Sequence, residues 1–244
     1  MNQHSHYLAY GSVSCSIEVE DPSNFITFGC GENILMFDSY LQYQHQKSFD
    51  DGVRSVALCS KRNEVYYLKT NRVVECMSAD CLVLKHQLKK FSSTNNYPRI
   101  AVNDRYVAVS NAERYKLHLY GFSSKTWQPY FAGIDKEWLR SLKFHPDGDL
   151  LTLNNDGWIR KYRISDTEAP EVKWESRATA NKSYALCVDQ NTGLVYVTGS
   201  NHMLYILSAG MSVNMQYLCE NPICYEVQPR PGEVTQILVT KKLL

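Results

Sequence analysis

A repeated pattern of short alternating segments constrains the fold of this chain more than any other feature. Residues 141–164 read SLKFHPDGDLLTLNNDGWIRKYRI, three runs of alternating apolar and polar residues separated by HPDGD and NNDGW. Alternation with a period of two predicts β-strands, and Gly, Asn and Asp between the runs predict tight turns. The third run recurs along the chain, and the residues that we align in it are Phe37, Cys76, Tyr120, Tyr162 and Leu207. These positions are 39, 44, 42 and 45 residues apart.

Each repeat also contains two earlier runs and one weaker later run, which gives four short strands in every forty-odd residues. A single four-stranded sheet has two apolar faces and cannot bury both of them alone. Sheets that stack around an axis as blades bury both faces and leave only short edges exposed. The predicted fold class is therefore all-β, a β-propeller of four-stranded blades that forms a single domain over residues 1–244.

The strand pattern also predicts where each blade lies. We expect five blades at approximately 12–49, 53–91, 97–132, 138–177 and 183–221. A sixth unit begins at residue 222, but its third strand would fall at about position 250, beyond Leu244. We therefore expect six blades, with a closing blade built from both termini, residues 222–244 and 6–11. The alternative is that the chain is part of a seven-bladed ring.

The opening stretch resembles a WD40-type repeat from its inner strand to its third strand. Asp156 falls at that family's turn position, and Tyr162 falls where the family has a tryptophan. Phe37-Asp38 is similar to the family's Trp-Asp ending, although no blade has a true Trp-Asp or a Gly-His pair before its inner strand. NHL-type propellers are nearly as similar, because their AVD-x-x-G-x-V-Y-V pattern resembles residues 187–207 and 99–122. Both resemblances imply a propeller.

Charge and hydropathy exclude several classes of function. The formal net charge is +1, so any electropositive site must be local rather than spread over the whole chain. No run reaches the roughly eighteen apolar residues of a membrane span, and MNQHSHYLAYGS lacks the pattern of a signal peptide. The eight cysteines are scattered without the pattern of a disulfide framework. We therefore expect free thiols, an intracellular location in the cytoplasm or nucleus, and no membrane contact.

The sequence has no motif of a known catalytic or metal centre. It contains no nucleophile elbow, HExxH, P-loop or glycine-rich dinucleotide motif. Cys76/Cys81 and Cys219/Cys224 have four intervening residues, whereas a zinc knuckle has two. His145 lies in HPDG, a sequence that suits a type I turn. We expect no enzyme activity, no cofactor and no bound metal.

A hydrolase with a metal in its axial channel is an alternative that the propeller resemblance leaves open. Six-bladed hydrolases and lactonases bind calcium there through Glu, Asn and Asp side chains from several blades. The residues of these types near strand ends are Glu18, Asn103, Asn154, Asn155 and Asp189. The same residue types are ordinary turn formers.

The strongest functional signal is the set of residues at one equivalent position in successive repeats, which we call a column. Counting back 21 to 23 residues from each aligned third-strand residue reaches the start of the inner strand. In successive blades this column holds Cys15, Arg54, Arg99, Arg140 and Tyr184, with Tyr225 in the incomplete unit. Only eleven arginines occur in the chain, so three of them in one column predict a shared role. Equal positions in successive blades predict an arc on one face, around the mouth of the axial channel.

Two interpretations of this column remain. Arginine can bind carboxylate, phosphate or carbonyl groups through its planar fork, and tyrosine offers contact area with a polar tip. Trp138, two residues before Arg140, would add to such a surface. Alternatively, the side chains cover strand ends and pair with nearby acids, of which the candidates are Asp50, Asp51, Asp135 and Glu137.

The WD40 resemblance implies a non-catalytic platform. We expect an interaction scaffold, a subunit of a larger complex, that binds an acidic or carbonyl-rich segment of a partner protein or peptide. The predicted partner-binding residues are Arg54, Arg99, Arg140, Tyr184, Tyr225 and Trp138. The NHL resemblance implies the alternative of an RNA-binding propeller, in which bases stack on tyrosines and arginines hold phosphates. A channel-metal hydrolase is the second alternative.

Overall fold

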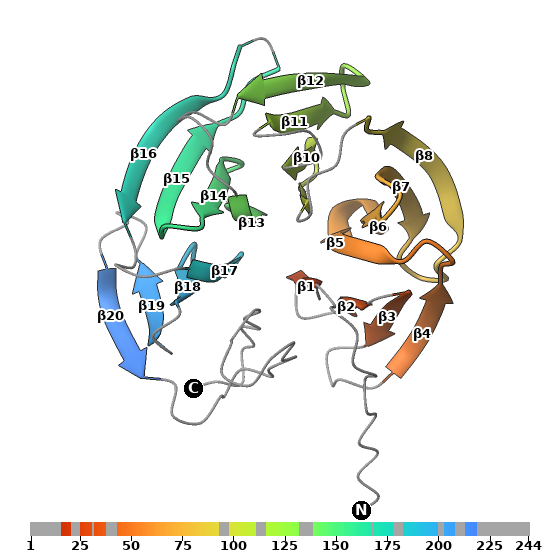
Figure 1. Cartoon of the computed structure of the whole chain (residues 1–244), viewed down its shortest axis with the longest axis horizontal. Helices are drawn as coiled ribbons and strands as arrows, with labels where there is room; N and C mark the ends of the chain where they lie inside the picture. The colour runs from red at the N-terminus through yellow and green to blue at the C-terminus, as the bar shows by residue number, and fades with distance from the viewer. Residues whose placement is uncertain are drawn as a thin grey trace, which may run out of the picture.

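The computed structural model of the chain describes residues 16–20, 25–30, 32–37, 43–92, 98–110, 116–131, 139–166, 168–177, 183–199, 203–207 and 213–218. Within these residues, twenty strands form five antiparallel sheets of four strands each. The sheets stand around one axis as the blades of a propeller (Figure 1). In the same residues the only helical segment is a 3₁₀ turn at Ser60–Arg62, and no helix could span a membrane. The predicted all-β propeller of four-stranded antiparallel blades is confirmed.

Every blade is a meander of four consecutive strands. The first contains β1 Ser16–Glu20, β2 Phe25–Cys30, β3 Asn33–Phe37 and β4 Tyr43–Ser48. The second contains β5 Val53–Cys59, β6 Glu64–Lys69, β7 Val73–Ser78 and β8 Leu84–Lys90. The third contains β9 Arg99–Val102, β10 Tyr106–Ser110, β11 Lys116–Gly121 and β12 Thr126–Phe131. The fourth contains β13 Leu139–Phe144, β14 Leu150–Asn154, β15 Trp158–Arg163 and β16 Glu171–Arg177. The fifth contains β17 Ser183–Val188, β18 Val195–Gly199, β19 Met203–Leu207 and β20 Val213–Leu218.

The first strand of each blade lies nearest the axis, and the fourth lies at the rim (Figure 1). Neighbouring inner strands contact one another in the order β1, β5, β9, β13, β17. The described strands leave one sector of the ring between β20 and β4 (Figure 1). Residues 222–244 and 6–11, which we expect to form the closing blade, lie outside the described residues, so the count of six blades stays a prediction.

Each junction between adjacent blades has its own apolar core. Alternation along a strand places successive side chains on opposite faces of a blade, so each blade contributes to two cores. In β10, Val107 and Val109 pack against the second blade, whereas Ala108 packs against the fourth. Burying one side chain of the size of valine or leucine contributes about 1.5–3 kcal/mol. Because every junction buries several such side chains, stacking fixes the order and tilt of the blades.

The rim strands are mostly exposed, which explains why their sequence pattern is weak. Every residue of β4 is exposed, and β8 exposes most of its sequence LKHQLKK. Both are edge strands of their sheets. Charged side chains on an exposed edge oppose pairing with strands of other molecules. The lysines of β8 therefore have a plain structural role.

The strand pairing corrects one aligned position. In the fourth blade Phe144 pairs with Leu150 and Leu150 with Tyr162, and all three pack against the third blade. The same ladder in the second blade ends at Met77, because Val65 pairs with Met77 and both pack with Ile34 of the first blade. Cys76 faces the opposite way, into the core shared with the third blade. The alignment that placed Cys76 in this column is therefore wrong by one residue.

Candidate functional site

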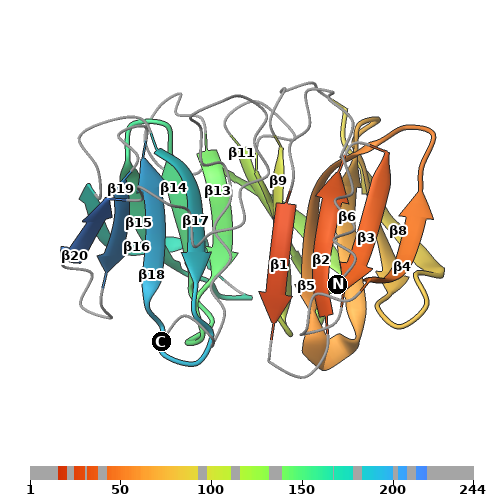
Figure 2. The same cartoon turned by 90° about the horizontal axis from the view of Figure 1, so that it is seen from below.

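The inner strands begin on one face of the ring, which we call the N-face, and end on the other, the C-face. Figure 2 shows β1, β13 and β17 running in the same direction. The N-face is defined by the residues at these starts: Arg54, Arg99, Arg140 and Tyr184. The side chains of the three arginines are half-buried. Tyr225 and Trp138 lie outside the described residues.

A β-bulge occurs at the start of three inner strands. In β13, Leu139 pairs with Asn154 and Ser141 pairs with Leu153, so Arg140 is the extra residue that the register between the two strands skips. Arg54 in β5 and Tyr184 in β17 occupy the same place in their own blades. A bulge bends its strand and turns the extra side chain away from the regular pleat. Sequence spacing could not reveal the bulges, because they are defined by the pairing of β5, β13 and β17 with the second strands.

Arg99 does not share this register. It pairs directly with Ser110, as Ser141 pairs with Leu153, so its counterparts in the neighbouring blades are Ser55 and Ser141. The residue before it, Pro98, holds the place of Arg54 and Arg140. The expectation that Arg99 occupies the same position as the other two arginines is therefore wrong by one residue. The difference arises because Arg99 lies three residues before Val102, the residue that pairs with Val107, whereas Arg140 lies four residues before Phe144, which holds the same place in its own blade.

Arg99 and its counterparts join each blade to the next. The backbone N–H of Ile100 donates to Ser55 Oγ at 3.2 Å, which links the second and third blades. Arg99 Nε donates to the Arg140 carbonyl at 2.8 Å, which links the third and fourth. Ser141 Oγ donates to the Leu186 carbonyl at 3.3 Å, which links the fourth and fifth. In the second, third and fourth blades, this one position thus forms a hydrogen bond between adjacent inner strands.

Arg140 is held by a side chain of its own blade. Its Nε and Nη2 both donate to Asn155 Oδ1, at 3.0 and 2.7 Å. Asn155 follows β14 and lies on the N-face, because the neighbouring Asn154 pairs with Leu139 at the start of β13. The structure therefore brings Arg99, Arg140 and Asn155 together at the junction of the third and fourth blades.

The N-face of the second blade carries acidic groups. Asp51 lies 3.4 Å from Lys69 Nζ and accepts a hydrogen bond from Asn71 Nδ2 at 2.6 Å. Glu75 accepts a hydrogen bond from the Tyr67 hydroxyl at 2.7 Å. Burial and this bond raise the pKa of Tyr67, so it remains neutral. Asp135 and Glu137, the other acids that could pair with the arginines, lie outside the described residues.

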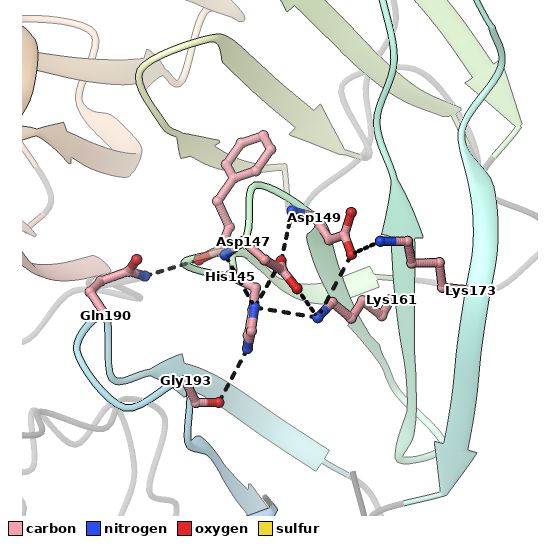
Figure 3. A network of polar contacts seen from close by, with 8 residues as sticks. His145, Asp147, Asp149, Lys161, Lys173, Gln190 and Gly193 are labelled. Atoms are coloured by element: carbon pink, nitrogen blue, oxygen red, sulfur yellow. Dashed lines mark hydrogen bonds and ion pairs between the residues drawn. The ribbon is translucent and has the colours of Figure 1, made fainter. Parts of the chain in front are cut away.

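The C-face of the fourth and fifth blades contains a polar network (Figure 3). His145 Nδ1 lies 2.8 Å from Asp147, and His145 Nε2 lies 3.3 Å from the Gly193 carbonyl of the fifth blade. Lys161 contacts His145 Nδ1 at 3.3 Å and forms an ion pair with Asp147. Partial burial works against the ionised form of Asp147, but Lys161, a backbone N–H and His145 together lower its pKa to about 2.

This network links the turn after β13 to the fifth blade and to the rim of its own blade. The Gly148 N–H donates to the His145 carbonyl at 2.9 Å, which confirms the predicted turn at HPDG. Asp149 pairs with Lys173 at 2.7 Å, so the turn is also tied to the rim strand β16. Gln190 Nε2 donates to the Phe144 carbonyl at 2.9 Å, a second bond between the two blades. The histidine side chain is nearly buried, with 9% of it exposed, so it offers little surface to a ligand.

The residues proposed for a channel metal are not brought together. Asn103 and Asp189 directly follow the inner strands β9 and β17 on the C-face, and their side chains accept backbone N–H groups of the adjoining turns. Asn154 and Asn155 lie on the N-face, where Asn154 Oδ1 accepts the Trp158 N–H at 2.8 Å. The side chain of Glu18 lies outside what the structure describes. Across the described residues, no three His, Cys, Asp or Glu side chains gather as a metal site would require.

The sequence did not predict the cluster of charged residues around the buried Glu64 in the second blade. Glu64 is 6% exposed and is contacted by Arg62 at 2.9 Å, by Lys85 at 3.1 Å and by the Tyr66 hydroxyl. Burial alone would raise the pKa of Glu64, but these three donors lower it. The Arg62 guanidinium also lies 4.0 Å from the centre of the Phe122 ring in the third blade. The cluster therefore helps to join the second and third blades.

Four cysteines have described side chains, and all four are free thiols: Cys59, Cys76, Cys81 and Cys187. Burial raises the pKa of the Cys76 thiol to about 12, so this side chain behaves as a small apolar group rather than a nucleophile.

Comparison with known proteins gives the fold but not a function. No family model matches the chain, and no curated protein is similar to it. Among solved structures, Raptor from Chaetomium thermophilum matches with a TM-score of 0.67 and 12% identity, over 84% of this chain and 20% of that chain. The β-propeller domain of Cps50 (Swd1) from Myceliophteria thermophila matches with a TM-score of 0.63 and 9% identity, over 87% of this chain and 73% of that one. This chain thus spans about a fifth of the length of the Raptor chain. The chain is a β-propeller, and its resemblance to WD40-type propellers is confirmed at the level of the fold.

Proposed function

We propose that this chain is a non-catalytic interaction scaffold whose N-face binds a partner protein or peptide. The observation that supports this most strongly is the repeated bulge, which places Arg54 and Arg140 at equivalent positions two blades apart. Tyr184 occupies the same backbone position in the fifth blade. Such an arc presents fork-shaped cations to carboxylate or carbonyl groups on a surface fixed by the stacked blades. Trp138 and Tyr225 complete the proposed surface.

The fold supports this proposal, because a rigid ring presents side chains from several blades without needing to order them on binding. Acidic or carbonyl-rich segments are the partner chemistry that guanidinium groups bind best. We further propose that the scaffold works in a larger assembly inside the cell, in the cytoplasm or nucleus. The free thiols Cys59, Cys76 and Cys187, two of them fully buried, fit a reducing compartment.

The test compares a double variant, Arg54→Asp with Arg140→Asp, with the wild type in quantitative pull-downs from a matched extract. We expect the double variant to lose the partners that the wild type retains, while its circular dichroism and urea midpoint stay close to wild type. Arg163→Asp is the matched control, because Arg163 is an exposed arginine of the fourth blade that pairs with Glu171 on the C-face side. Retention of the same partners by the double variant would refute the proposal.

The salt dependence of binding separates this proposal from RNA binding. An RNA held through several phosphates loses affinity by orders of magnitude between about 50 and 200 mM salt. A peptide anchored by one or two carboxylates loses much less. A single-stranded RNA that binds the N-face with the steep dependence, in the absence of a protein partner, would favour the RNA-binding alternative.

A further inference from the structure

We propose that the outer edge of the second blade, residues 83–90, is a second interaction surface, which binds an acidic segment of a partner protein that also carries aliphatic side chains. We call these residues the β8 edge. They lie at the rim of the ring (Figure 1), on the opposite side of the blade from its inner strand β5. The inference therefore goes beyond the proposed function of the N-face and does not depend on it.

The strand of the β8 edge carries positive charge only. It reads LKHQLKK, with three lysines and no acid. Lys85 pairs with the buried Glu64 at 3.1 Å. Among the residues that the structure describes, neither Lys89 nor Lys90 forms an ion pair. Two positive charges thus remain at the end of the strand, and they favour an anionic partner.

The rim strand of the fourth blade shows that protection of an edge does not require charges of one sign. Charges of either sign oppose the pairing of an exposed edge with other strands. β16 reads EVKWESR and carries both signs. Its charges are paired with others in the same blade: Glu171 with Arg163, Lys173 with Asp149 and Glu175 with Arg160. Edge protection alone therefore does not explain why β8 has only lysines, whereas an acidic partner does.

Lys89 is positioned without being neutralised. Its Nζ lies 4.9 Å from the centre of the Phe91 ring and 5.5 Å from the centre of the Trp127 ring in the third blade. Aromatic rings attract an ammonium group through their quadrupole and carry no net charge. A partner carboxylate would therefore meet a lysine that is already ordered, which lowers the entropic cost of binding.

The other end of the β8 edge exposes two aliphatic side chains, Val83 at 59% and Leu84 at 53%. The turn before them is closed by two hydrogen bonds: the Ser78 N–H donates to the Val83 carbonyl at 2.9 Å, and the Val83 N–H donates to Ser78 Oγ at 3.2 Å. Leu82 has φ +52°, which is unusual for leucine, and its side chain is buried in the core between the first and second blades. The turn thus holds Leu82 inside and Val83 outside, which fixes an apolar contact surface.

The order of these features defines the partner. Leu84 and Lys90 are the first and last residues of β8, so they lie at most about 20 Å apart at roughly 3.3 Å per residue. An extended segment with aliphatic residues at one end and acids at the other fits this order. β8 has bulges where it pairs with β7, so the partner would contact side chains rather than extend the sheet. An RNA would gain from the lysines, but Val83 and Leu84 offer its bases no ring for stacking.

The probe is the peptide acetyl-Leu-Leu-Gly-Gly-Gly-Glu-Glu-amide, titrated at low salt into the full chain labelled with nitrogen-15. We expect the backbone amide resonances of the β8 edge to shift with a dissociation constant below about 1 mM. One control peptide replaces both glutamates by glutamine, and another replaces both leucines by serine. Each control should bind about five- to tenfold more weakly. The oligonucleotide heptauridylate should bind more weakly than the probe peptide.

The lysines are tested by a matched set of double variants. Lys89→Gln with Lys90→Gln should weaken the probe peptide about fivefold, whereas Lys89→Arg with Lys90→Arg should keep its affinity. The control is Lys61→Gln with Lys125→Gln, because it removes the same charge from two exposed lysines of C-face turns. Since salt screens such distant charges, the control should change the affinity by less than about twofold.

The aliphatic end has its own matched pair. Leu84→Ser should weaken the probe peptide about threefold, because it removes an apolar contact. Val172→Ser is the control, since Val172 is an exposed aliphatic residue, 43% exposed, on the rim strand of the fourth blade. It should leave the affinity unchanged. The circular dichroism and urea midpoint of every variant are compared with the wild type, so that a loss of binding is scored only in folded protein.

Three results would overturn this inference: equal binding of the glutamate and glutamine peptides, unchanged affinity in the Lys89→Gln, Lys90→Gln variant, or tighter binding of heptauridylate than of the probe peptide. The Arg54→Asp, Arg140→Asp variant, which tests the proposed function, should bind the probe peptide as the wild type does. Loss of peptide binding in that variant would place the probe on the N-face and would also refute the inference. The pull-down that tests the proposed function is decided by its own result, so the two proposals can fail separately.

Discussion

At the scale of single residues, one hydroxyl or guanidinium in each of the second, third and fourth blades joins its inner strand to the next. Ser55, Arg99 and Ser141 occupy the same paired position, and each makes a hydrogen bond to the next blade. Ser110 lies directly opposite Arg99 and faces the fourth blade, since it follows the alternation of Ala108. Its hydroxyl is fully buried and has no hydrogen-bond partner in the part of the chain that the structure describes.

We therefore expect Ser110→Ala and Ser141→Ala to change the free energy of unfolding in opposite directions. Removing an unpaired buried hydroxyl should leave the free energy of unfolding unchanged or raise it by up to about 1 kcal/mol. Removing the Ser141 hydroxyl breaks its bond to the Leu186 carbonyl and should cost about 1 kcal/mol. Urea unfolding of both variants measures the difference. Equal destabilisation would mean that the Ser110 hydroxyl has a partner in the folded protein.

The Asp147 carboxylate predicts a dependence of stability on pH. Its pKa is about 2 in the folded chain against an ordinary value of 3.8, so its contribution is complete above about pH 4 and is lost as the pH falls towards 2. The full shift corresponds to about 2 kcal/mol, but 44% of the side chain is exposed, and we expect less than about 1 kcal/mol. Asp147→Asn should remove this part of the pH dependence in urea unfolding at pH 6, 4 and 2.5. An unchanged profile would contradict the assignment.

At the scale of elements, turns on the C-face join blades as well as strands. The turn after β13 contributes His145, and the turn after β17 contributes the Gly193 carbonyl that His145 contacts. Gly193 has φ +70°, and a Cβ there would lie 3.0 Å from His145 Nε2. Gly148 has φ +89°, but a Cβ there would meet nothing within 4 Å. Both glycines have a positive φ that would strain an alanine, but only at Gly193 would the added Cβ also contact His145.

Gly193→Ala and Gly148→Ala therefore form a matched pair. Both substitutions should lower the free energy of unfolding by about 1 kcal/mol, because they place alanine at positive φ. Gly193→Ala should cost about 1 kcal/mol more, because the new methyl group must displace the His145 ring from the fifth blade. Differential scanning calorimetry should show the lower melting temperature for Gly193→Ala. Equal melting temperatures would show that the contact between the two turns adds no stability.

At the scale of the whole molecule, stability depends on every blade face being covered. On β17, Leu186 and Val188 pack against the fourth blade, whereas Ala185 belongs to a cluster on the opposite face with Tyr196 and Leu204. That second face is turned towards the sector between β20 and β4 (Figure 1). Covering a few hundred Å² of apolar surface contributes several kcal/mol at about 25 cal/mol per Å². We infer that a closing blade covers it.

Deleting residues 1–11 tests the closing strand proposed at residues 6–11. The truncated chain should melt several degrees lower, because the closing blade would lose one strand and expose its neighbours. Deleting only residues 1–5 is the control and should leave the melting temperature unchanged, since the proposed strand remains. If both truncated chains melt at the wild-type temperature, residues 6–11 do not close the ring.

The local pattern of the sequence determined the strands, the repeat and the propeller, because alternation and turn residues act within a few positions of the chain. It also placed Arg54, Arg140 and Tyr184 at the starts of inner strands. Tertiary structure alone decided the bulges, the one-residue offset of Arg99 and Cys76, and the link from Arg99 through Arg140 to Asn155. Register and contacts between blades depend on which strand pairs with which, and a shift of one residue reverses the face of a side chain without altering the alternation. The candidate site depends on register and on contacts between blades, so the tertiary structure was needed to define it.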